Sequence, residues 1–286
     1  MADRENGKIG FCSETSEIRA ARAALHMWEE PCISGQEGSG TVFFTGCTLR
    51  CVFCQNHEIA GSKVGKVISE ERLAEIFLEL QGKCANNINL VTPTHFVPQI
   101  IRALQSAKDQ GMYLPVVYNT GGYERVETLK MLDGLVDIYL PDFKYLNTDY
   151  AKKYSMAEDY PEVAKAALAE MVRQAGKPAF DERGMMKHGV IVRHLLLPGC
   201  LADGKRVVKY LYETYGNRIY MSLMSQYTPL ASLDSEKYPE LNRKVPEYAY
   251  EKLVDYAISL GVTQAFVQEG DTAKESFIPP FTLEGV

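Results

Sequence analysis

The sequence predicts an α/β fold in which parallel strands alternate with helices. Short apolar segments typical of buried strands are each followed by a segment whose apolar residues recur at the spacing of one helix face. Such alternation implies parallel pairing through right-handed crossovers. Six or seven of these units fit an incomplete barrel or a doubly wound sheet. The chain of 286 residues, 46% of them hydrophobic, can bury a sizeable core.

The first helix after the cysteine-containing loop illustrates the pattern. Apolar residues from Leu73 to Leu80 lie three or four positions apart, which places them on one face of a helix beginning near Ser69. The predicted strands are Thr41–Thr45, Ile88–Val91, Leu114–Tyr118, Val136–Leu140, Val190–Leu197, Ile219–Met224 and Thr263–Val267.

The second half of the chain begins with a longer helical region. Residues 145–174 are predicted to be mostly helical. Asp203 is the predicted N-cap of a helix that reaches Tyr215, because its carboxylate can accept from free backbone amides. Pro246 opens a further helix that ends at Gly261.

Composition and charge limit the classes of function. The net charge of −6, without any cluster of Lys or Arg, argues against nucleic acid as the main partner. Residues 1–8 are charged and lack the apolar core of a secretory signal. No apolar run is long enough to cross a bilayer. We therefore predict a soluble, cytoplasmic protein without a membrane segment.

Polar and ionisable residues follow nearly every predicted strand. In parallel α/β folds, binding and catalysis gather at the carboxyl ends of the strands, so these residues are candidates for a functional site. They include Thr92–His95, Asn119–Tyr123, Asp142–Lys144, Ser225–Tyr227 and Gln268–Glu269.

Arg193 and His194 differ from the others because they lie inside an apolar strand, Val190–Leu197. A buried arginine needs a partner for its charge. A ligand carboxylate and a protein aspartate both meet that need, and the sequence leaves both open.

Cys47, Cys51 and Cys54 have the spacing C-x3-C-x2-C directly after the first predicted strand. In a chain without a secretory signal, this pattern fits metal binding better than disulfides. Three thiolates on a four-iron cluster would leave one iron open for a ligand. A closed Cys3His zinc site is the competing interpretation, because His57 follows Cys54 closely. Zinc sites usually draw ligands from two separated segments, so the spacing favours a cluster.

The cysteine spacing, with the aromatic Phe53 just before Cys54, resembles the signature of the radical S-adenosylmethionine superfamily. Other segments resemble its branch of pyruvate formate-lyase activating enzyme-like iron–sulfur proteins. These segments are Glu29–Gly35, Ser39–Asn56, Tyr118–Tyr123, Pro141–Tyr145, Arg193–Leu195 and Gln226–Tyr227. The resemblance implies a partial (β/α)6-type barrel with parallel strands and a short N-terminal extension.

The resemblance also implies cofactors and partners. Cys47, Cys51 and Cys54 would hold a 4Fe-4S cluster at which S-adenosylmethionine is reductively cleaved to a 5′-deoxyadenosyl radical. That radical would abstract hydrogen from a protein or peptide substrate, for example to activate a glycyl radical enzyme. An electron donor such as flavodoxin or ferredoxin is implied as well. The residues expected near S-adenosylmethionine are Phe53, Thr92, Thr94, Asn119, Asp142, Lys144, Arg193, His194 and Gln226.

Three parts of the chain are expected on this basis. Residues 1–38 form an N-terminal extension with a helix near Glu14–Glu29, residues 39–270 form the partial barrel, and residues 271–286 form a C-terminal tail. Asp271–Ser276 is predicted to be a polar loop.

Two alternatives to a radical enzyme follow from the cysteines. One is a structural zinc-binding (Cys3His) interaction protein without catalysis, and the other is an iron–sulfur protein that only transfers electrons. Iron, sulfide and zinc content test the first alternative. Formation of 5′-deoxyadenosine tests the second.

Overall fold

The protein is described by a computed structural model that covers residues 3–268 and 279–286. The strands are β1 (Arg19–His26), β2 (Ser39–Phe44), β3 (Lys66–Val67), β4 (Ile88–Val91), β5 (Val116–Thr120), β6 (Ile138–Pro141), β7 (Ala179–Phe180), β8 (Met186–Leu195), β9 (Tyr220–Met224) and β10 (Ala265–Val267). The α-helices are α1 (Pro31–Ser34), α2 (His57–Ala60), α3 (Glu70–Gly82), α4 (Val97–Asp109), α5 (Val126–Lys130), α6 (Thr148–Ser155), α7 (Tyr160–Ala175), α8 (Leu201–Tyr215) and α9 (Glu247–Leu260). Short 3₁₀ helices cover Thr94–Phe96, Gly216–Arg218 and Pro239–Asn242.

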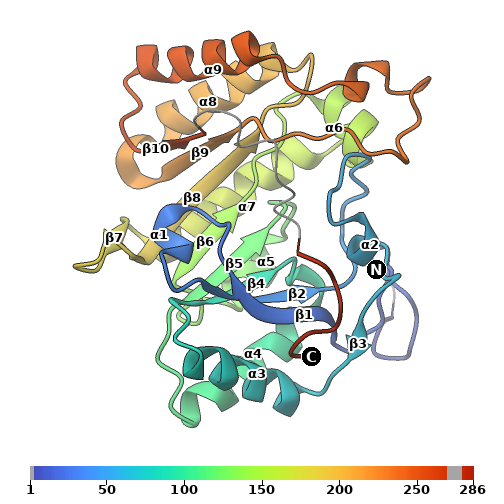
Figure 1. The fold of residues 1–286 in the computed structure, drawn as a ribbon, viewed down its shortest axis with the longest axis vertical. Coiled ribbons are helices and arrows are strands. Elements are labelled where there is room, and N and C mark those ends of the chain that lie inside the picture. Colours follow the sequence, from blue (N-terminus) through green and yellow to red (C-terminus); the bar gives the residue numbers. More distant parts are fainter. Residues whose placement is uncertain (1–2, 269–278) are drawn as a thin grey trace.

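The strands form one curved sheet in the order β10-β9-β8-β6-β5-β4-β2-β1-β3, and β7 pairs with β8. From β2 to β10 along this order, all neighbours are parallel, whereas β1 is antiparallel to β2. Within the described ranges, the two ends of the sheet do not pair, so the barrel stays open. The predicted partial barrel of parallel strands is confirmed (Figure 1).

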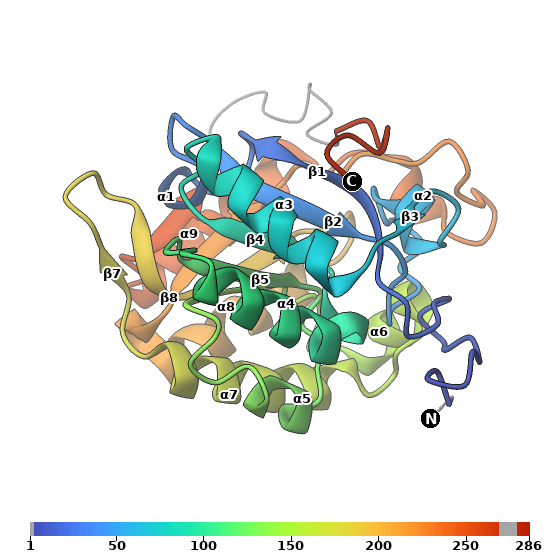
Figure 2. The ribbon, with the colours of Figure 1, turned by 90° about the horizontal axis from the view of Figure 1, so that it is seen from below.

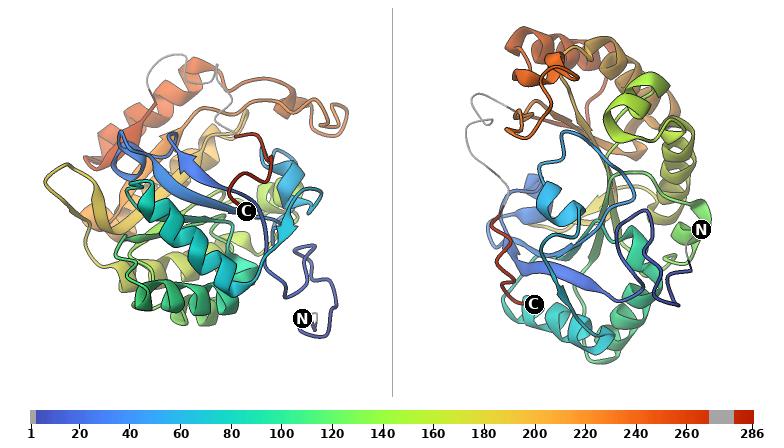
Figure 3. Two further views of the ribbon diagram at one scale, coloured as in Figure 1. Left: turned by 60° about the horizontal axis from the view of Figure 1, so that its bottom comes forward. Right: turned by 90° about the vertical axis from the view of Figure 1, so that its right-hand side faces the viewer.

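Helices cover the outside of this open barrel. Figure 2 shows α3 and α4 packed side by side against the sheet, and Figure 3 shows the helices following the curve of the strands. The N-cap Ser69 of α3 accepts a hydrogen bond from the Arg72 amide, as expected for this start. Helix α9 runs from Glu247 to a left-handed Gly261, which confirms the predicted stop.

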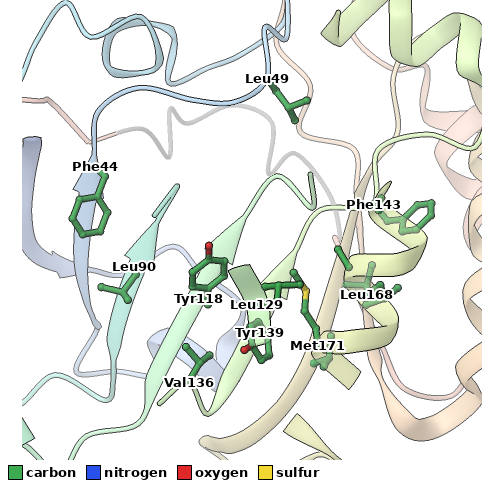
Figure 4. Packing of buried hydrophobic residues seen from close by; sticks show 14 of the residues in the cluster. Phe44, Leu49, Leu90, Tyr118, Leu129, Val136, Tyr139, Phe143, Leu168 and Met171 are labelled. Atoms are coloured by element: carbon green, nitrogen blue, oxygen red, sulfur yellow. The ribbon is translucent and has the colours of Figure 1, made fainter. Parts of the chain in front are cut away.

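Successive side chains of each strand face opposite sides of the sheet. They contribute to three apolar clusters, the smallest of which joins Ala21 of β1, Phe43 of β2 and Val91 of β4 to Ile59. The largest cluster includes Tyr118 of β5, Tyr139 of β6 and Leu168 of α7 (Figure 4). The second cluster packs Ile33 of α1 against Ile138 of β6 and other inward residues. Helix α1 therefore fills part of the barrel interior, below the carboxyl ends of the strands.

The N-terminal extension contains a strand where a helix was expected near Glu14–Glu29. Arg19–His26 forms β1, which pairs with β2 along most of its length. The segment is rich in alanine, which has the highest intrinsic helix propensity, but pairing with β2 overrides this local preference. The predicted helix was therefore wrong for the physical reason that strand formation here depends on a distant partner.

The described end of the chain lies along β1. The Ala23 amide donates to the Glu284 carbonyl at 2.8 Å, and the Leu283 amide donates to the Ala21 carbonyl at 3.1 Å. Residues 279–286 thereby cover an edge of β1 that would otherwise be unpaired (Figure 1). The predicted polar loop Asp271–Ser276 lies outside the described residues.

Asp203 does not cap α8, contrary to expectation. The helix begins at Leu201 with Cys200 at the N-cap position, and Asp203 lies in the first turn. Its buried carboxylate instead accepts from the Leu146 amide at 3.1 Å and from Arg206 at 2.5 Å. Tertiary packing thus uses this carboxylate to join α8 to the segment after β6.

In the described part of the chain, no helix has the length and apolar character needed to cross a membrane.

Candidate active site

The loop that contains Cys47, Cys51 and Cys54, here called the cysteine loop, follows β2 and begins with a turn at Gly46. The φ angle of Gly46 is 80°, in the left-handed region that favours glycine. A Cβ at this position would lie 2.6 Å from the Cys12 carbonyl oxygen. That same oxygen accepts a hydrogen bond of 3.1 Å from the Cys47 amide. Glycine therefore lets the N-terminal segment fix the backbone of the first cysteine.

The other side of the cysteine loop is held by the end of α6. The Arg50 amide donates to the Ser155 carbonyl at 3.2 Å, and the Val52 amide donates to the Tyr154 carbonyl at 2.9 Å. These carbonyls end a helix and have no partner inside it. Their pairing with the loop holds the backbone around Cys51 in place.

The three cysteines line one cavity of about 260 Å³ at the carboxyl ends of the strands. Burial raises the pKa of Cys47 to about 11 and that of Cys54 to about 12. A buried thiolate is stable only beside positive charge, and iron ions of a cluster supply it. The lining also contains Phe53, Thr92, Asn119, Asp142, Lys144, Arg193 and Gln226. A shared cavity with three thiols is a donor set that fits an iron–sulfur cluster with one open iron.

Strand alternation brings three polar residues of the site to one face. Asn119, Asp142 and Arg193 lie on the inward side, each two positions beyond an inward apolar residue. The Arg193 guanidinium donates to Asp142 Oδ1 at 3.0 Å, to Glu29 Oε2 at 3.2 Å and to Asn119 Oδ1 at 2.5 Å. Protein carboxylates are therefore the partners of this buried arginine.

Lys144 adds a second cation beside Asp142. Its Nζ donates to Asp142 Oδ2 at 2.6 Å and lies 6.0 Å from the centroid of the Phe53 ring. Burial opposes the charge on Lys144, but the Asp142 carboxylate raises the lysine pKa above its ordinary value. Burial likewise opposes the charge on Asp142, while Lys144 and Arg193 lower the pKa of that carboxyl. All three groups are consequently charged at neutral pH.

Two further residues expected at the site line the same cavity. Thr92 follows β4 with a φ of 57°, an uncommon conformation for a residue other than glycine, and its amide donates to the Asn119 carbonyl at 2.9 Å. The Gln226 side-chain oxygen accepts from Gln268 Nε2 at 2.9 Å. The backbone carbonyl of Gln226 accepts from Gln55 Nε2 at 3.4 Å.

Thr94 and His194 are not among the lining residues. The Thr94 hydroxyl donates to the buried carboxylate of Glu124 at 2.5 Å. His194 is one position after Arg193 and so faces the outer side of the sheet, where its Nδ1 lies 2.8 Å from the Phe143 carbonyl. Burial lowers the pKa of His194, which keeps it neutral.

Two residues that contact the site were given no role from the sequence. Glu29 pairs with Arg193, and the Ser155 hydroxyl lies 3.0 Å from the Cys51 sulfur. The acidic pair Glu29–Glu30 before Pro31 was a usable signal, because a buried arginine requires a carboxylate. Ser155 carries no comparable signal, since a serine at a helix end is common.

The Cys3His alternative requires His57, which begins α2 after the cysteine loop. Among residues 3–268 and 279–286, the structure has no group of three His, Cys, Asp or Glu side chains placed to bind a single metal ion. Iron and zinc analysis is the measurement that separates the two interpretations.

Comparison with known proteins gives two related sequences. An uncharacterized protein of Methanocaldococcus jannaschii is 28% identical over 258 residues, which cover 87% of this chain and 69% of that protein. Pyruvate formate-lyase-activating enzyme of Clostridium pasteurianum is 26% identical over 216 residues, which cover 70% of this chain and 79% of the enzyme.

A solved structure shows the same fold. Streptococcus suis SuiB bound to precursor peptide SuiA aligns with a TM-score of 0.52 at 12% identity, covering 78% of this chain. The chain spans about half the length of SuiB, 46%. The family match itself extends over residues 41–199, from β2 to the end of the segment after β8. Because that match covers more than half of the 286 residues, the chain belongs to the radical S-adenosylmethionine superfamily of enzymes.

Proposed function

We propose that this enzyme holds a 4Fe-4S cluster at Cys47, Cys51 and Cys54 and cleaves S-adenosylmethionine beside it. The proposal is carried by the shared cavity, which the three thiols line together with Asp142 and Lys144 from the end of β6 and Arg193 of β8. After one-electron reduction by a donor such as flavodoxin or ferredoxin, the bound cluster and S-adenosylmethionine would supply a 5′-deoxyadenosyl radical.

The residues of the chain would bind and orient S-adenosylmethionine. Lys144 and Arg193 are fixed cations that suit its carboxylate, because their own positions are set by Asp142. The Phe53 ring offers an apolar face to the adenine. Asn119 and Gln226 provide amide groups for the ribose or adenine edges. The burial of these groups excludes water from the place where a radical would form.

The substrate we propose is a polypeptide, with the glycyl radical site of a partner enzyme as the specific candidate. The similarity to pyruvate formate-lyase-activating enzyme supports this choice, and SuiB, which shares the fold, was crystallised with a precursor peptide. A second cleft of about 480 Å³ shares Arg193, Met224 and Gln226 with the cysteine cavity. This cleft offers an extended chain a route to the cavity.

The cluster is tested by anaerobic reconstitution of the full chain. We expect about four irons and four sulfides per chain, little zinc, and 5′-deoxyadenosine when S-adenosylmethionine and dithionite are added. Cys51→Ala should lose both the cluster and the product. Cys84→Ala is the matched control, because Cys84 is exposed and outside the cavity. A colourless protein with one zinc would refute the proposal.

The substrate is tested with a glycyl radical enzyme. The reconstituted protein, S-adenosylmethionine and reductant are incubated with pyruvate formate-lyase, and the glycyl radical is sought by electron paramagnetic resonance. A radical signal that depends on Cys51 supports activation. Formation of 5′-deoxyadenosine without any glycyl radical would reject this partner and retain the radical chemistry.

A further inference from the structure

The sulfur of Cys51 is contacted by a buried side-chain hydroxyl. Ser155 is the last residue of α6, and its Oγ lies 3.0 Å from Cys51 Sγ. The same Oγ lies 3.0 Å from the Tyr145 hydroxyl. Ser155 and Tyr145 each expose only 1% of their surface. These three groups form a continuous chain of polar atoms that ends at the middle cysteine of the loop.

The direction of this chain is fixed once Cys51 is a cluster ligand. A coordinating cysteine is a thiolate, which has no proton and can only accept. Ser155 must then donate to Cys51, and its oxygen is free to accept from Tyr145. Burial keeps water from competing for these groups, so each hydrogen bond is stronger than it would be at the surface.

The position of the Ser155 hydroxyl is set by the same contacts that hold the cysteine loop. The Ser155 carbonyl accepts from the Arg50 amide, one residue before Cys51. Helix α6 stops directly after Ser155, at Met156, whose φ of 55° is left-handed. The hydroxyl and the sulfur are thus attached to one local structure, so their separation does not depend on a flexible segment.

We propose that Ser155 and Tyr145 are positioning residues that donate a hydrogen-bond relay to the Cys51 thiolate and thereby raise the reduction potential of the cluster. The inference rests on the proposed function, because the cluster must be bound at Cys51. Hydrogen bonds to cluster sulfurs withdraw negative charge and favour the reduced state. A higher potential would make the one-electron reduction easier for an external donor.

The test is a redox titration of the reconstituted full chain with dithionite, followed by electron paramagnetic resonance. We expect Ser155→Ala to lower the midpoint potential, because it removes the donor to sulfur. Tyr145→Phe should lower it less, because it removes only the second bond. Ser155→Thr should restore the potential by returning a hydroxyl.

Two buried residues of the same types serve as controls. The Ser39 hydroxyl at the start of β2 donates to Asn87, and the Tyr139 hydroxyl on the outer face donates to Gln174. Ser39→Ala and Tyr139→Phe should keep the wild-type midpoint potential. These two variants show whether the loss of a buried hydroxyl elsewhere in the fold changes the midpoint potential of the cluster.

The outcomes are distinct. A wild-type potential in Ser155→Ala with full iron content would overturn the relay and leave the proposed function standing. If Ser155→Ala fails to take up iron, Tyr145→Phe decides: a lowered potential supports the relay and an unchanged one overturns it. If the wild-type chain itself takes up no iron, the proposed function fails and the relay fails with it.

Discussion

Arg193 of β8 and Glu29, which precedes α1, form an ion pair of 3.2 Å across 164 positions of sequence. Their side chains are only 16% and 8% exposed. Glu29 belongs to the N-terminal extension, whereas Arg193 lines the cysteine cavity. The extension therefore contributes two things: strand β1 to the sheet, and a carboxylate that balances the charge of Arg193 in the site.

Replacing Arg193 by methionine should destabilise the fold strongly. Arg193→Met removes the cation shared by the buried Glu29 carboxylate and the half-buried Asp142 carboxylate, of which Asp142 keeps its ion pair with Lys144. Breaking a buried ion pair by removing one partner costs about 3–5 kcal/mol. We expect the free energy of unfolding to fall by about that amount in urea denaturation.

Arg102→Met is the matched control. Arg102 pairs with Glu70 at 2.5 Å, but its side chain is 55% exposed. Exposed ion pairs contribute about 1 kcal/mol or less. Equal losses of unfolding free energy in the two variants would show that the ion pairs of Arg193 with Asp142 and Glu29 stabilise the fold no more than an exposed ion pair does.

The fold was predictable because its signals are local. The apolar run Val190–Leu197 and the helix beginning at Ser69 are specified by residues close in sequence, and the structure confirms both. Strand β1 was not predictable in this way. Its sequence favours a helix by local preference, and only its pairing with β2 and with residues 279–286 makes it a strand.

The sequence was sufficient to predict which strand ends contribute residues to the candidate site, because parallel strands bring their carboxyl ends together. Asn119, Asp142 and Arg193 were expected there and do line one cavity. His194 was assigned to the site without regard to the alternation of side chains, which turns it outward. The contact between Cys51 and Ser155 joins residues 104 positions apart and depends on tertiary packing that no local pattern encodes.

Gly122 should be intolerant of a side chain. Its φ is 78°, and a Cβ there would lie 2.2 Å from the carbonyl oxygen of Asp142. Gly122→Ala would force the segment of Asp142 and Lys144 to shift. We expect a loss of about 2–5 kcal/mol of unfolding free energy, from backbone strain and overpacking together. The affinity for S-adenosylmethionine, measured by isothermal titration on the reconstituted protein, should fall as well.

Gly134→Ala separates the contact from the backbone strain. Gly134 has the same φ of 78°, but a Cβ there would meet no atom within 4 Å. This variant should lose only about 1–2 kcal/mol and keep its affinity for S-adenosylmethionine. Similar effects of the two substitutions would contradict a role for the close approach of Gly122 to Asp142.

Glu124 should make stability depend on pH. Its carboxylate is buried just beyond the carboxyl end of β5, where it accepts from the hydroxyls of Thr94, Thr120 and Tyr118. Burial raises the pKa of Glu124 from 4.5 to about 7. Between these values the folded state binds a proton that the unfolded state has released. Stability therefore falls as pH rises from 4.5 to about 7 and stays lower above it, by on the order of 3 kcal/mol.

Glu124→Gln removes this titration. Its carbonyl oxygen can accept from Thr94 and Thr120, and its amide nitrogen can donate to the Tyr118 hydroxyl. Other groups titrate equally in both proteins, so the difference in unfolding free energy between variant and wild type isolates Glu124. That difference should shift in favour of the variant between pH 5 and pH 8 in urea denaturation, because only the wild type must ionise a buried carboxyl. A difference that stays constant over this range would mean that Glu124 ionises as readily in the folded state as in the unfolded chain. The three hydroxyls would then compensate its burial completely.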